Sequence, residues 1–326
     1  MRRYTNNAGV PLSLAVYLAT DNYDYSSEAK TISVTTLLKP IKQLVLAHRV
    51  PQDLSLTEVM ALVQSRMGSA IHDAIERSWI NNPAKALLAL GYPQKVIDRI
   101  RVNPEPGSLK EGDIPVYLEQ RTSKTIGGWK VSGKFDFVAE GRLEDFKTTS
   151  VFTWMNNSKD DDYIMQGSLY RWLNPEIITQ DRMAIQFLFT DWSTAQARAN
   201  PKYPPQRTME KTYPLKSPQE IEQFILAKLR MVEQYWDAPE EQIPNCTDEE
   251  LWRSEPVWKY YRNPANTTRS TKNFDDKQEA YLRKAQDGNT GLVVEVPGKA
   301  VACKYCPSFP ICKQAQALIA AGDLDV

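Results

Sequence analysis

The sequence lacks a long apolar run, a leader-like start and an excess of either charge. No apolar stretch approaches the roughly 18 residues that a membrane-spanning helix needs, and residues 1–24 have neither the apolar core nor the small-residue cleavage site of a signal peptide. We therefore expect a cytoplasmic protein with no membrane partner. Its 40 basic and 40 acidic residues cancel, so local patches or metal ions must hold any polyanion.

Cysteine and histidine are also scarce. The chain has 4 cysteines and 2 histidines, and three of the cysteines crowd together near the C-terminus. This pattern excludes the disulfide scaffold of a small secreted domain and favours metal ligation. Internal repeats and low-complexity segments are absent from the sequence. It also has no G-x4-G-K-[ST] segment to cradle a phosphate, so the chain carries no evident motor.

What is present is a globular composition with clear helical patterns. The 326 residues are 42% hydrophobic and 25% charged, which suffices for one large or two ordinary domains. Residues 31–50 have an apolar helical pattern that is interrupted at Pro40. Residues 55–80 carry apolar side chains at helical spacing, and Ser55 with Glu58 makes a capping box, which predicts a long helix.

The pattern changes to a period of two after this helical region. Three consecutive strands are predicted to form an antiparallel meander, at 115–123, 129–141 and 142–150. A helix, a strand and a second helix follow, at 161–174, 182–192 and 217–236. This order of elements predicts a mixed α/β fold.

The hairpin that ends the predicted meander gathers charged residues on one face. If Glu140 and Gly141 form a two-residue turn, with glycine supplying the positive φ, Asp136 lies directly opposite Asp145. Lys147 points to the same face, because side chains two residues apart on a strand share a face. The other face holds three aromatic residues: Phe135, Phe137 and Phe146.

Two aspartates that lie opposite each other repel unless a cation sits between them. A divalent ion removes this repulsion, and paired carboxylates suit Mg²⁺ or Mn²⁺. Lys147 beside them can orient a water molecule or neutralise charge on a phosphate. Glu144 is expected to point away from the pair. The alternative is an exposed hairpin in which Lys147 bridges two surface acids.

The helices on either side of the hairpin carry polar residues at helical spacing. Gly68, His72 and Glu76 are each four residues apart and share one face, as do Gln166 and Tyr170. These residues add an imidazole, an amide and a phenol to the candidate site. A lone histidine is more often structural than a ligand, and a pair such as Gln166 and Tyr170 is most often a capped core tyrosine.

Four motifs, in this order, resemble those of the RecB-like branch of the PD-(D/E)XK nuclease superfamily: Gly68-x3-His72, Gly133-x2-Asp136, Asp145-x-Lys147 and Gln166-x3-Tyr170. More broadly, five segments are similar to nucleases carried by tailed bacteriophages, over most of the chain: TTLLKPIKQLVL, GSAIHDAIE, LEDFKTTSVFTW, IMQGSLYRWLNP and CKYCPSFPIC. The resemblance implies an α/β, restriction-endonuclease-like core, with a central mixed sheet flanked by helices. It implies an N-terminal helical segment at 1–54, the nuclease core at 55–238 and a C-terminal cysteine-cluster cap at 239–326.

The resemblance also implies roles for the residues of the motifs. His72, Asp136 and Asp145 would ligate Mg²⁺ or Mn²⁺, together with the main-chain carbonyl of Phe146, and Lys147 would position and help to activate the attacking water. Gln166 and Tyr170 would bind near the scissile phosphate or the DNA backbone. Glu119, on the first strand, either supports a second ion or is a surface glutamate.

The implied activity is metal-dependent hydrolysis of phosphodiester bonds in DNA. We expect an exonuclease that acts on single-stranded DNA or DNA ends in phage recombination, repair or genome processing, in the host cytoplasm if phage-encoded, with a recombinase or helicase as a possible partner. A structure-specific or nicking endonuclease is one alternative. The other is a non-catalytic nucleic-acid-binding protein with structural zinc.

The spacing Cys303-x2-Cys306-x5-Cys312 lets three thiolates meet around one metal, and Cys246 is the fourth candidate ligand. Four cysteinates suit Zn²⁺ or an iron–sulfur cluster. The tail resembles that of the iron–sulfur-bearing RecB-like nucleases of the AddB and CRISPR-associated types, which implies a [4Fe-4S] cluster. In those relatives the first cysteine precedes the nuclease motifs, whereas Cys246 follows them. A metal centre held by Cys246 and the three later cysteines is therefore expected to link parts of the C-terminal region to one another.

Residues 251–274 interleave aromatic and basic side chains, as a channel for single-stranded DNA requires. The residues concerned are Trp252, Trp258, Tyr260 and Tyr261 with Arg253, Lys259, Arg262, Arg269 and Lys272. The alternative is that these aromatic residues pack a cap domain under a solvated rim. A second, weaker basic patch is expected on the first two strands, from Arg121, Lys124, Lys130 and Lys134.

Overall fold

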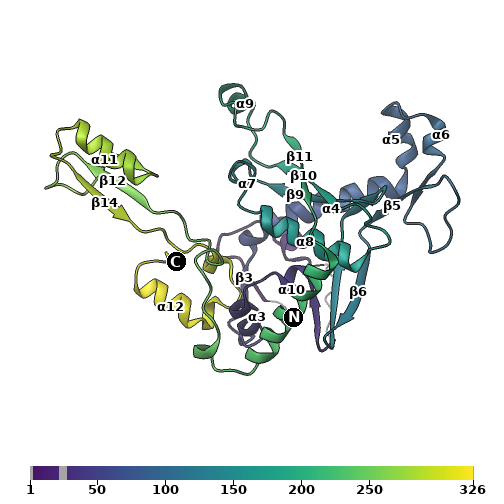
Figure 1. Ribbon diagram of the computed structural model, residues 1–326, viewed down its shortest axis with the longest axis horizontal. Coiled ribbons are helices and arrows are strands. Elements are labelled where there is room, and N and C mark those ends of the chain that lie inside the picture. Colours follow the sequence, from purple (N-terminus) through teal and green to yellow (C-terminus); the bar gives the residue numbers. More distant parts are fainter. Residues whose placement is uncertain (1–2, 22–27, 326) are drawn as a thin grey trace. The chain divides into compact units, whose positions relative to one another are not determined.

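The computed structural model describes residues 3–21 and 28–325, which fall into two compact units (Figure 1). The first unit contains Met1–Lys39 and Leu56–Arg230, and the second contains Pro40–Ser55 and Met231–Val326. Residues 40–55 therefore belong with the cysteine-bearing end of the chain, and not with an N-terminal segment as expected. Within the described ranges, no helix has both the length and the apolar composition needed to cross a bilayer.

The first unit is built on a six-stranded mixed sheet, which confirms the predicted α/β class. Its strands, in spatial order, are β11 (Thr208–Pro214), β10 (Arg182–Phe189), β9 (Arg142–Thr149), β8 (Phe137–Ala139), β5 (Ile114–Leu118) and β4 (Ile100–Val102). β9 pairs in parallel with β10, and β4 in parallel with β5, while the other pairs are antiparallel. The central strands are buried, with Leu143 and Ile185 fully enclosed.

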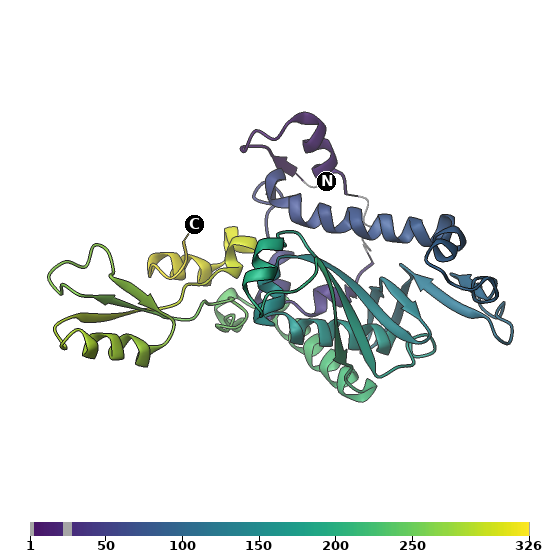
Figure 2. The same ribbon diagram turned by 90° about the horizontal axis from the view of Figure 1, so that it is seen from above.

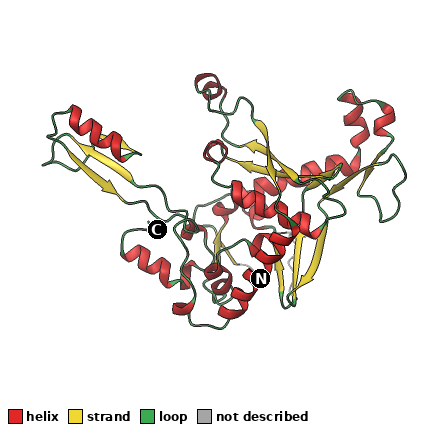
Figure 3. Cartoon of the chain, in the orientation of Figure 1, coloured by secondary structure: helices red, strands yellow, loops and turns green. Residues whose placement is uncertain are grey.

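A second sheet in this unit shows that the single meander was a wrong prediction. It contains β2 (Thr31–Ser33), β7 (Trp129–Lys134) and β6 (Arg121–Ile126), and its strands stand apart from β9–β11 in Figure 3. Two of the predicted strands each divide between the two sheets, one after β5 and one before β8. Both strands pass from one sheet to the other at the same place, where Glu119 N–H donates to the Asp136 carbonyl at 3.1 Å. Glu119 has a left-handed backbone there, with φ of 52°.

The hairpin register was predicted correctly. Glu140 and Gly141 both have positive φ, 50° and 78°, as a tight two-residue turn requires. Phe137 pairs with Glu144, and Ala139 pairs with Arg142. Extending this register by one residue places Asp136 across from Asp145.

Helices cover both faces of the main sheet. Figure 2 shows α4 (Val63–Asn81) along one side and α10 (Pro218–Tyr235) along the other. α8 (Asp160–Leu173) lies on the α10 side, where Trp172 Nε1 donates to Glu222 Oε1 at 3.1 Å. The sheet is thus the middle layer, and side chains on α4 and α8 approach it from opposite faces.

The predicted helix start at Ser55 was wrong. The chain instead forms β3 (Leu56–Glu58) and a 3-10 turn (Val59–Leu62) before α4 begins. β3 pairs in parallel with β1 (Arg3–Thr5). The Glu58 carboxylate accepts hydrogen bonds from the Thr5 hydroxyl and from the Asn7 and Ala8 backbone. Glu58 therefore caps a turn near the N-terminus and not a helix.

Short helices complete the first unit. They are α1 (Leu12–Ala19), α2 (Val34–Leu37), α5 (Pro83–Ala89), α6 (Gln94–Ile97), α7 (Val151–Asn156) and α9 (Thr194–Ala199). The break predicted at Pro40 is confirmed, because α2 ends at Leu37 and α3 begins at Ile41. Proline has no backbone N–H and fixes its own φ, so it starts a helix more readily than it continues one.

The second unit contains a small sheet and a helical region that carries the cysteines. The sheet has the order β13 (Lys272–Phe274), β12 (Val257–Tyr261), β14 (Leu292–Val296), and α11 (Lys277–Gln286) packs on it. The helical region contains α3 (Ile41–Ala47), α12 (Lys313–Ala320) and three 3-10 turns, Glu240–Gln242, Ala302–Tyr305 and Phe309–Ile311. Segments that are distant in sequence therefore meet around the cysteines.

Gly133 allows α8 to approach the second sheet closely. A Cβ atom at this position would lie 2.8 Å from Val34 Cγ2 and 2.9 Å from both Leu173 Cδ1 and Tyr170 Cε1. Gly133→Ala should therefore lower the free energy of unfolding by about 1–3 kcal/mol through overpacking, as measured by urea denaturation. Gly68→Ala is the control, because a Cβ there meets nothing within 4 Å and alanine favours the helix by about 0.5–1 kcal/mol. Equal effects of the two substitutions would contradict this account.

Candidate active site and cysteine pocket

Four parts of the first unit bring the predicted site residues together. His72 comes from α4, Asp136 and Glu119 come from the point where the chain changes sheets, and Asp145 to Lys147 come from β9. Gln166 and Tyr170 come from α8. Alternation along β9 points Phe146 toward α4, where its ring lies 5.8 Å from that of His72. Asp145 and Lys147 contact Gln166 of α8 from the other face.

His72 lies between the Phe146 carbonyl and two carboxylates. Its Nε2 is 2.9 Å from the Phe146 oxygen, and its Nδ1 is 3.5 Å from Asp136 Oδ1 and 3.8 Å from Glu119 Oε1. A carbonyl only accepts hydrogen bonds, so Nε2 carries a proton and Nδ1 is the atom that faces the acids. The carbonyl expected as a metal ligand thus accepts a hydrogen bond from His72 in this arrangement.

The carboxylates around His72 favour the protonated form of its imidazole. Burial lowers the pKa of His72, but hydrogen bonds with Asp136 and Glu119 and the charges of Asp136 and Asp145 outweigh it and raise the pKa to about 10. One ligand atom from each of His72, Glu119 and Asp136 lies within 4.8 Å of the others. An imidazole and hard carboxylate oxygens at this spacing are a donor set that fits Mg²⁺ or Mn²⁺.

Glu119 is part of this group, and the surface alternative for it was wrong. Its side chain is only 11% exposed and forms an ion pair with Lys134 Nζ. The strand pattern did not mark Glu119, because its orientation depends on the left-handed backbone at that residue.

Asp136 is held in its ionised form. Its Oδ2 accepts a hydrogen bond from the Phe146 backbone N–H at 2.9 Å. Burial alone would raise the pKa of Asp136, but the hydrogen bond and charge of His72, with the charge of Lys147, lower it below the usual range. Asp136 is therefore anionic at neutral pH.

Asp145 and Lys147 form a buried ion pair. Asp145 is 1% exposed, and its Oδ2 lies 2.5 Å from Lys147 Nζ. Burial raises the pKa of Asp145 to about 6, with Lys147 opposing the rise and Asp136 adding to it. Burial would lower the pKa of Lys147, but the charges of Asp145 and Asp136 raise it. The ammonium therefore stays protonated beside two carboxylates.

Gln166 links this ion pair to Tyr170. Its Nε2 donates to Asp145 Oδ1 at 3.3 Å and to the Tyr170 hydroxyl at 3.0 Å, while its Oε1 lies 3.4 Å from Lys147 Nζ. The amide thereby orients both the acid and the phenol. Tyr163, one turn earlier on α8, places its ring 5.6 Å from Lys147 Nζ and was not predicted as part of the site.

Glu144 points away from the site, as strand alternation predicted. Its carboxylate contacts Arg142 Nη2 at 2.5 Å and accepts from Gln186 Nε2 at 3.0 Å. These contacts lie on the face of β9 opposite Asp145. Glu144 and Asp145 are therefore adjacent carboxylates in different surroundings.

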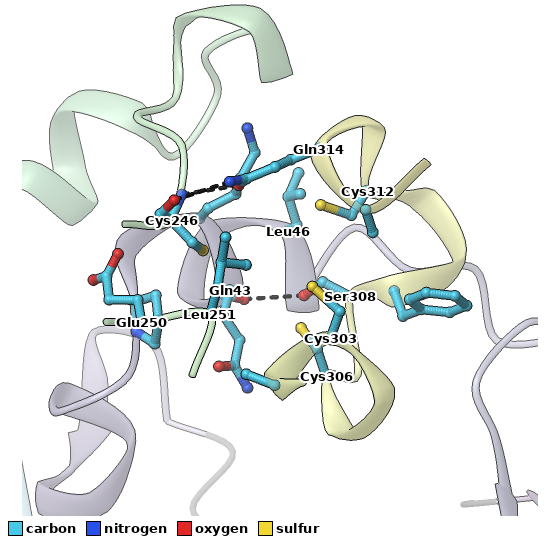
Figure 4. Close-up of a pocket in the computed structure, with 15 residues that line it drawn as sticks. Gln43, Leu46, Cys246, Glu250, Leu251, Cys303, Cys306, Ser308, Cys312 and Gln314 are labelled. Carbon is cyan, nitrogen blue, oxygen red and sulfur yellow. Dashed lines mark hydrogen bonds between the residues drawn. The ribbon is translucent and has the colours of Figure 1, made fainter. Parts of the chain in front are cut away.

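The four cysteines of the second unit line one pocket, which encloses about 450 Å³ of space not filled by atoms, part of it open to solvent. Figure 4 shows their sulfurs facing this space. The pocket is also lined by Lys42, Gln43 and Leu46 of α3. The expectation that the cysteines close the C-terminal region on itself was therefore wrong, because an N-terminal helix forms one wall.

Hydrogen bonds fix the segments that carry the thiols. The Gln314 side chain accepts from Cys246 N–H at 2.8 Å and donates to the Cys246 carbonyl at 2.9 Å. Ser308, only 1% exposed, donates to the Gln43 carbonyl at 3.2 Å. Both contacts are drawn as dashed lines in Figure 4. They join α12 to the Cys246 segment and the Cys306–Cys312 loop to α3.

Burial keeps the free thiols protonated. Burial raises the pKa of Cys246 to about 12, and Glu250 and the other cysteines add to the rise. Burial also raises the pKa of Cys303 and of Cys312. Among the described residues, no three of these sulfurs form a group within 4.8 Å of one another, as the ligand atoms of His72, Glu119 and Asp136 do.

The two basic surfaces predicted for DNA are less available than expected. Tyr260 and Tyr261 are buried, and Tyr260 donates to Asp287, so they pack the small sheet and present no stacking face. Arg253 pairs with Asp248 and Asp323, and Arg262 pairs with Asp287. In the second patch, Lys130 pairs with Glu28, Lys134 with Glu119, and Lys124 donates to the Trp172 carbonyl.

No protein-family model matches the chain, and no curated protein is similar to it in sequence. Two solved structures are similar in part. The crystal structure of SSO0001 shares 13% identity, with 67% of this chain and 83% of that chain covered and a TM-score of 0.41. A phage-related exonuclease from Haemophilus somnus 129PT shares 12% identity, with 64% and 93% covered and a TM-score of 0.29. Likenesses this weak establish neither a common fold nor a common activity.

Proposed function

We propose that this protein is a metal-dependent DNA nuclease with a PD-(D/E)XK-type active site. The observation that carries the proposal is the buried lysine paired with Asp145, with the charges of Asp136 and His72 acting on the same pair. Lys147 lies 2.5 Å from Asp145, and Asp136 and His72 lie within the same charged cluster. Carboxylates that hold a divalent ion, with an adjacent ammonium, are suited to hydrolysis of a phosphodiester.

The residues that would hold the metal are His72, Asp136 and Asp145, with Glu119 and the Phe146 carbonyl as further ligands. A bound Mg²⁺ or Mn²⁺ supplies Lewis-acid stabilisation of phosphate charge and lowers the pKa of water. The Phe146 N–H keeps Asp136 oriented, and Gln166 keeps Asp145 oriented. These two hydrogen bonds hold the carboxylates of Asp136 and Asp145 in place before the substrate binds.

Lys147 acts as a hydrogen-bond donor and a fixed charge. Its raised pKa keeps the ammonium protonated, so it orients the attacking water and stabilises the charge that develops on the phosphate. The Tyr170 hydroxyl, which accepts from Gln166 Nε2, can donate to a phosphate oxygen, while the two N–H groups of Gln166 orient Asp145 and this hydroxyl. The resemblance of the four motifs to those of RecB-like nucleases supports DNA as the substrate, and attack at the ends rests on analogy with that family.

The activity is tested with end-labelled and internally labelled linear DNA, single- and double-stranded, incubated with Mg²⁺ or Mn²⁺. We expect mononucleotides or short products to appear first from the ends, and circular DNA to be spared. Cleavage of circular DNA would favour the endonuclease alternative. Absence of metal-dependent cleavage on every substrate would overturn the proposal.

We also propose that the cysteines bind a [4Fe-4S] cluster. The choice over zinc rests on the resemblance of the Cys303-x2-Cys306-x5-Cys312 tail to that of the iron–sulfur-bearing RecB-like nucleases. In a four-iron cluster each thiolate binds a different iron atom. Purification without oxygen should give a brown protein with iron and acid-labile sulfide. A colourless protein with stoichiometric zinc would overturn the choice.

Metal binding at the active site should release protons. The pKa of His72 is about 10 without metal, and a metal binds only neutral imidazole, so the ion must displace a proton at neutral pH. The apparent affinity for Mn²⁺ should therefore rise about tenfold per pH unit between pH 7 and 8.5. Calorimetry in two buffers of different ionisation enthalpy counts the protons, and we expect about one per ion.

The control for this proton count is His72→Asn, which keeps a polar ligand but has no proton to lose. Its Mn²⁺ affinity should be weaker and nearly independent of pH over the same interval. If wild-type protein releases no proton, His72 either is neutral before the ion binds or does not ligate it, and either result contradicts this account.

A further inference from the structure

Lys42 is a lysine in an unusual place. It lies on α3 with only 4% of its surface exposed, and it lines the cysteine pocket. Lysine is almost never fully buried unless a partner compensates its charge. Its ammonium donates to Asn245 Oδ1 at 2.7 Å, which is a neutral partner, and lies 3.9 Å from Glu240 Oε1. One distant carboxylate compensates a buried charge only in part.

The partners of Lys42 are bonded to the segments that carry two of the thiols. Asn245 directly precedes Cys246. Glu240 Oε1 also accepts a hydrogen bond from the Lys313 backbone N–H at 2.7 Å, and Lys313 directly follows Cys312. The ammonium therefore sits between two ligand segments, on the wall that α3 contributes.

A thiolate-ligated centre supplies the charge that Lys42 lacks. Four thiolates around Zn²⁺, or around a [4Fe-4S] core in its oxidised form, leave a double negative charge. A buried anion of this kind is costly without a cation nearby. We infer that Lys42 is the fixed counter-charge of the metal centre at the cysteines, and that it ties α3 to that centre. This inference rests on the proposed metal and is independent of nuclease activity.

The competing explanation is that Lys42 only anchors α3 through Asn245. Three substitutions separate the two explanations. Lys42→Met keeps the apolar stem and removes the charge, and Lys42→Arg keeps the charge. Glu240→Gln keeps the acceptor for the Lys313 N–H but removes the competing negative charge, so it should act in the opposite direction to Lys42→Met.

The test measures how fast the metal-loaded full chain releases zinc or iron to an excess of a colorimetric chelator. Lys42→Met should release the metal about tenfold faster than the wild type, as loss of a partner next to the ligands does in other metal sites. Lys42→Arg should stay near the wild-type rate, and Glu240→Gln should release more slowly. Lys304→Met is the control, because this lysine is exposed although it lies between Cys303 and Cys306 in sequence.

Rates are compared at a temperature where circular dichroism shows every variant folded. Wild-type release rates in both Lys42→Met and Glu240→Gln would overturn the inference, as would faster release in Glu240→Gln. If Lys42→Met does not fold, the sign of the Glu240→Gln effect decides. A wild-type chain without metal at its cysteines would overturn both this inference and the proposed centre. The DNA cleavage assay reports separately on the nuclease.

Discussion

Asp145→Asn should lower the rate of DNA cleavage about a thousandfold or more at saturating Mg²⁺. The substitution keeps the shape of a side chain that is 1% exposed but removes the negative charge that Lys147 and the proposed metal both need. Loss of one fixed electrostatic contact to the reacting groups typically costs about 10²–10³ in rate, and here the proposed metal ligand and the partner of the ammonium disappear together. The measurement is single-turnover cleavage of labelled DNA, with Mn²⁺ binding followed by calorimetry.

The matched control for Asp145→Asn is Glu144→Gln, one residue earlier on β9. Glu144 contacts Arg142 and Gln186 on the opposite face, so its neutralisation should leave cleavage within about twofold of the wild type, as expected for a residue outside the site. If Glu144→Gln lost activity while Asp145→Asn kept it, the register of β9 in the site would be wrong. If both kept activity, the chemistry would lie elsewhere.

The part of this site that was predictable from the sequence is the part set by local chemistry. A Glu-Gly turn with two positive φ angles determines which residues of the hairpin pair, and alternation then puts Asp145 and Lys147 on one face and Phe146 on the other. The helical spacing of Gln166 and Tyr170 likewise survives in α8, where the two side chains are hydrogen-bonded. Each of these inferences spans only a few residues.

The contribution of Glu119 was not predictable in this way. In the sequence, polar and apolar residues alternate without interruption through Phe135 and Asp136. In the structure, β7 ends at Lys134 and β8 begins in the other sheet at Phe137. The change depends on the hydrogen bond from Glu119 N–H to the Asp136 carbonyl, which joins two strands. Ser55 is a similar case. The capping pattern is present, but β3 pairs with β1, and the Glu58 carboxylate accepts a hydrogen bond from Thr5 instead of capping a helix. Tertiary contacts overrode a local signal in both places.

The wall that α3 adds to the cysteine pocket shows the same limit over a longer distance. Short turns join Cys303, Cys306 and Cys312, and the three residues line one pocket. Nothing in the spacing of these cysteines indicates that Lys42 and Gln43, some 260 residues earlier, complete the pocket. The compact unit formed by residues 40–55 and 231–326 is a consequence of that long-range packing.

Cys303→Ala should destabilise the second unit far more than the lost sulfur contacts alone explain. Truncating a buried cysteine to alanine removes one atom, a change of about 1 kcal/mol. A structural thiolate centre, by contrast, contributes on the order of 10 kcal/mol of folding free energy, and three remaining ligands hold it weakly. We therefore expect the thermal transition of this unit to fall by about 10 °C or more, with loss of most of the bound metal. Calorimetric melting and elemental analysis of the full chain measure both effects.

Lys304→Ala provides the comparison for Cys303→Ala, since it changes the next residue in the same 3-10 turn and leaves all four thiols in place. It should keep full metal content and melt within a few degrees of the wild type. Wild-type protein stripped by a chelator should melt like Cys303→Ala, because both lack the same centre. A Cys303→Ala protein that melts like Lys304→Ala would mean that packing of α3 and α12 alone holds this unit together. The cysteines would then be reduced thiols in an ordinary core, and the counter-charge assigned to Lys42 would have no anion to balance.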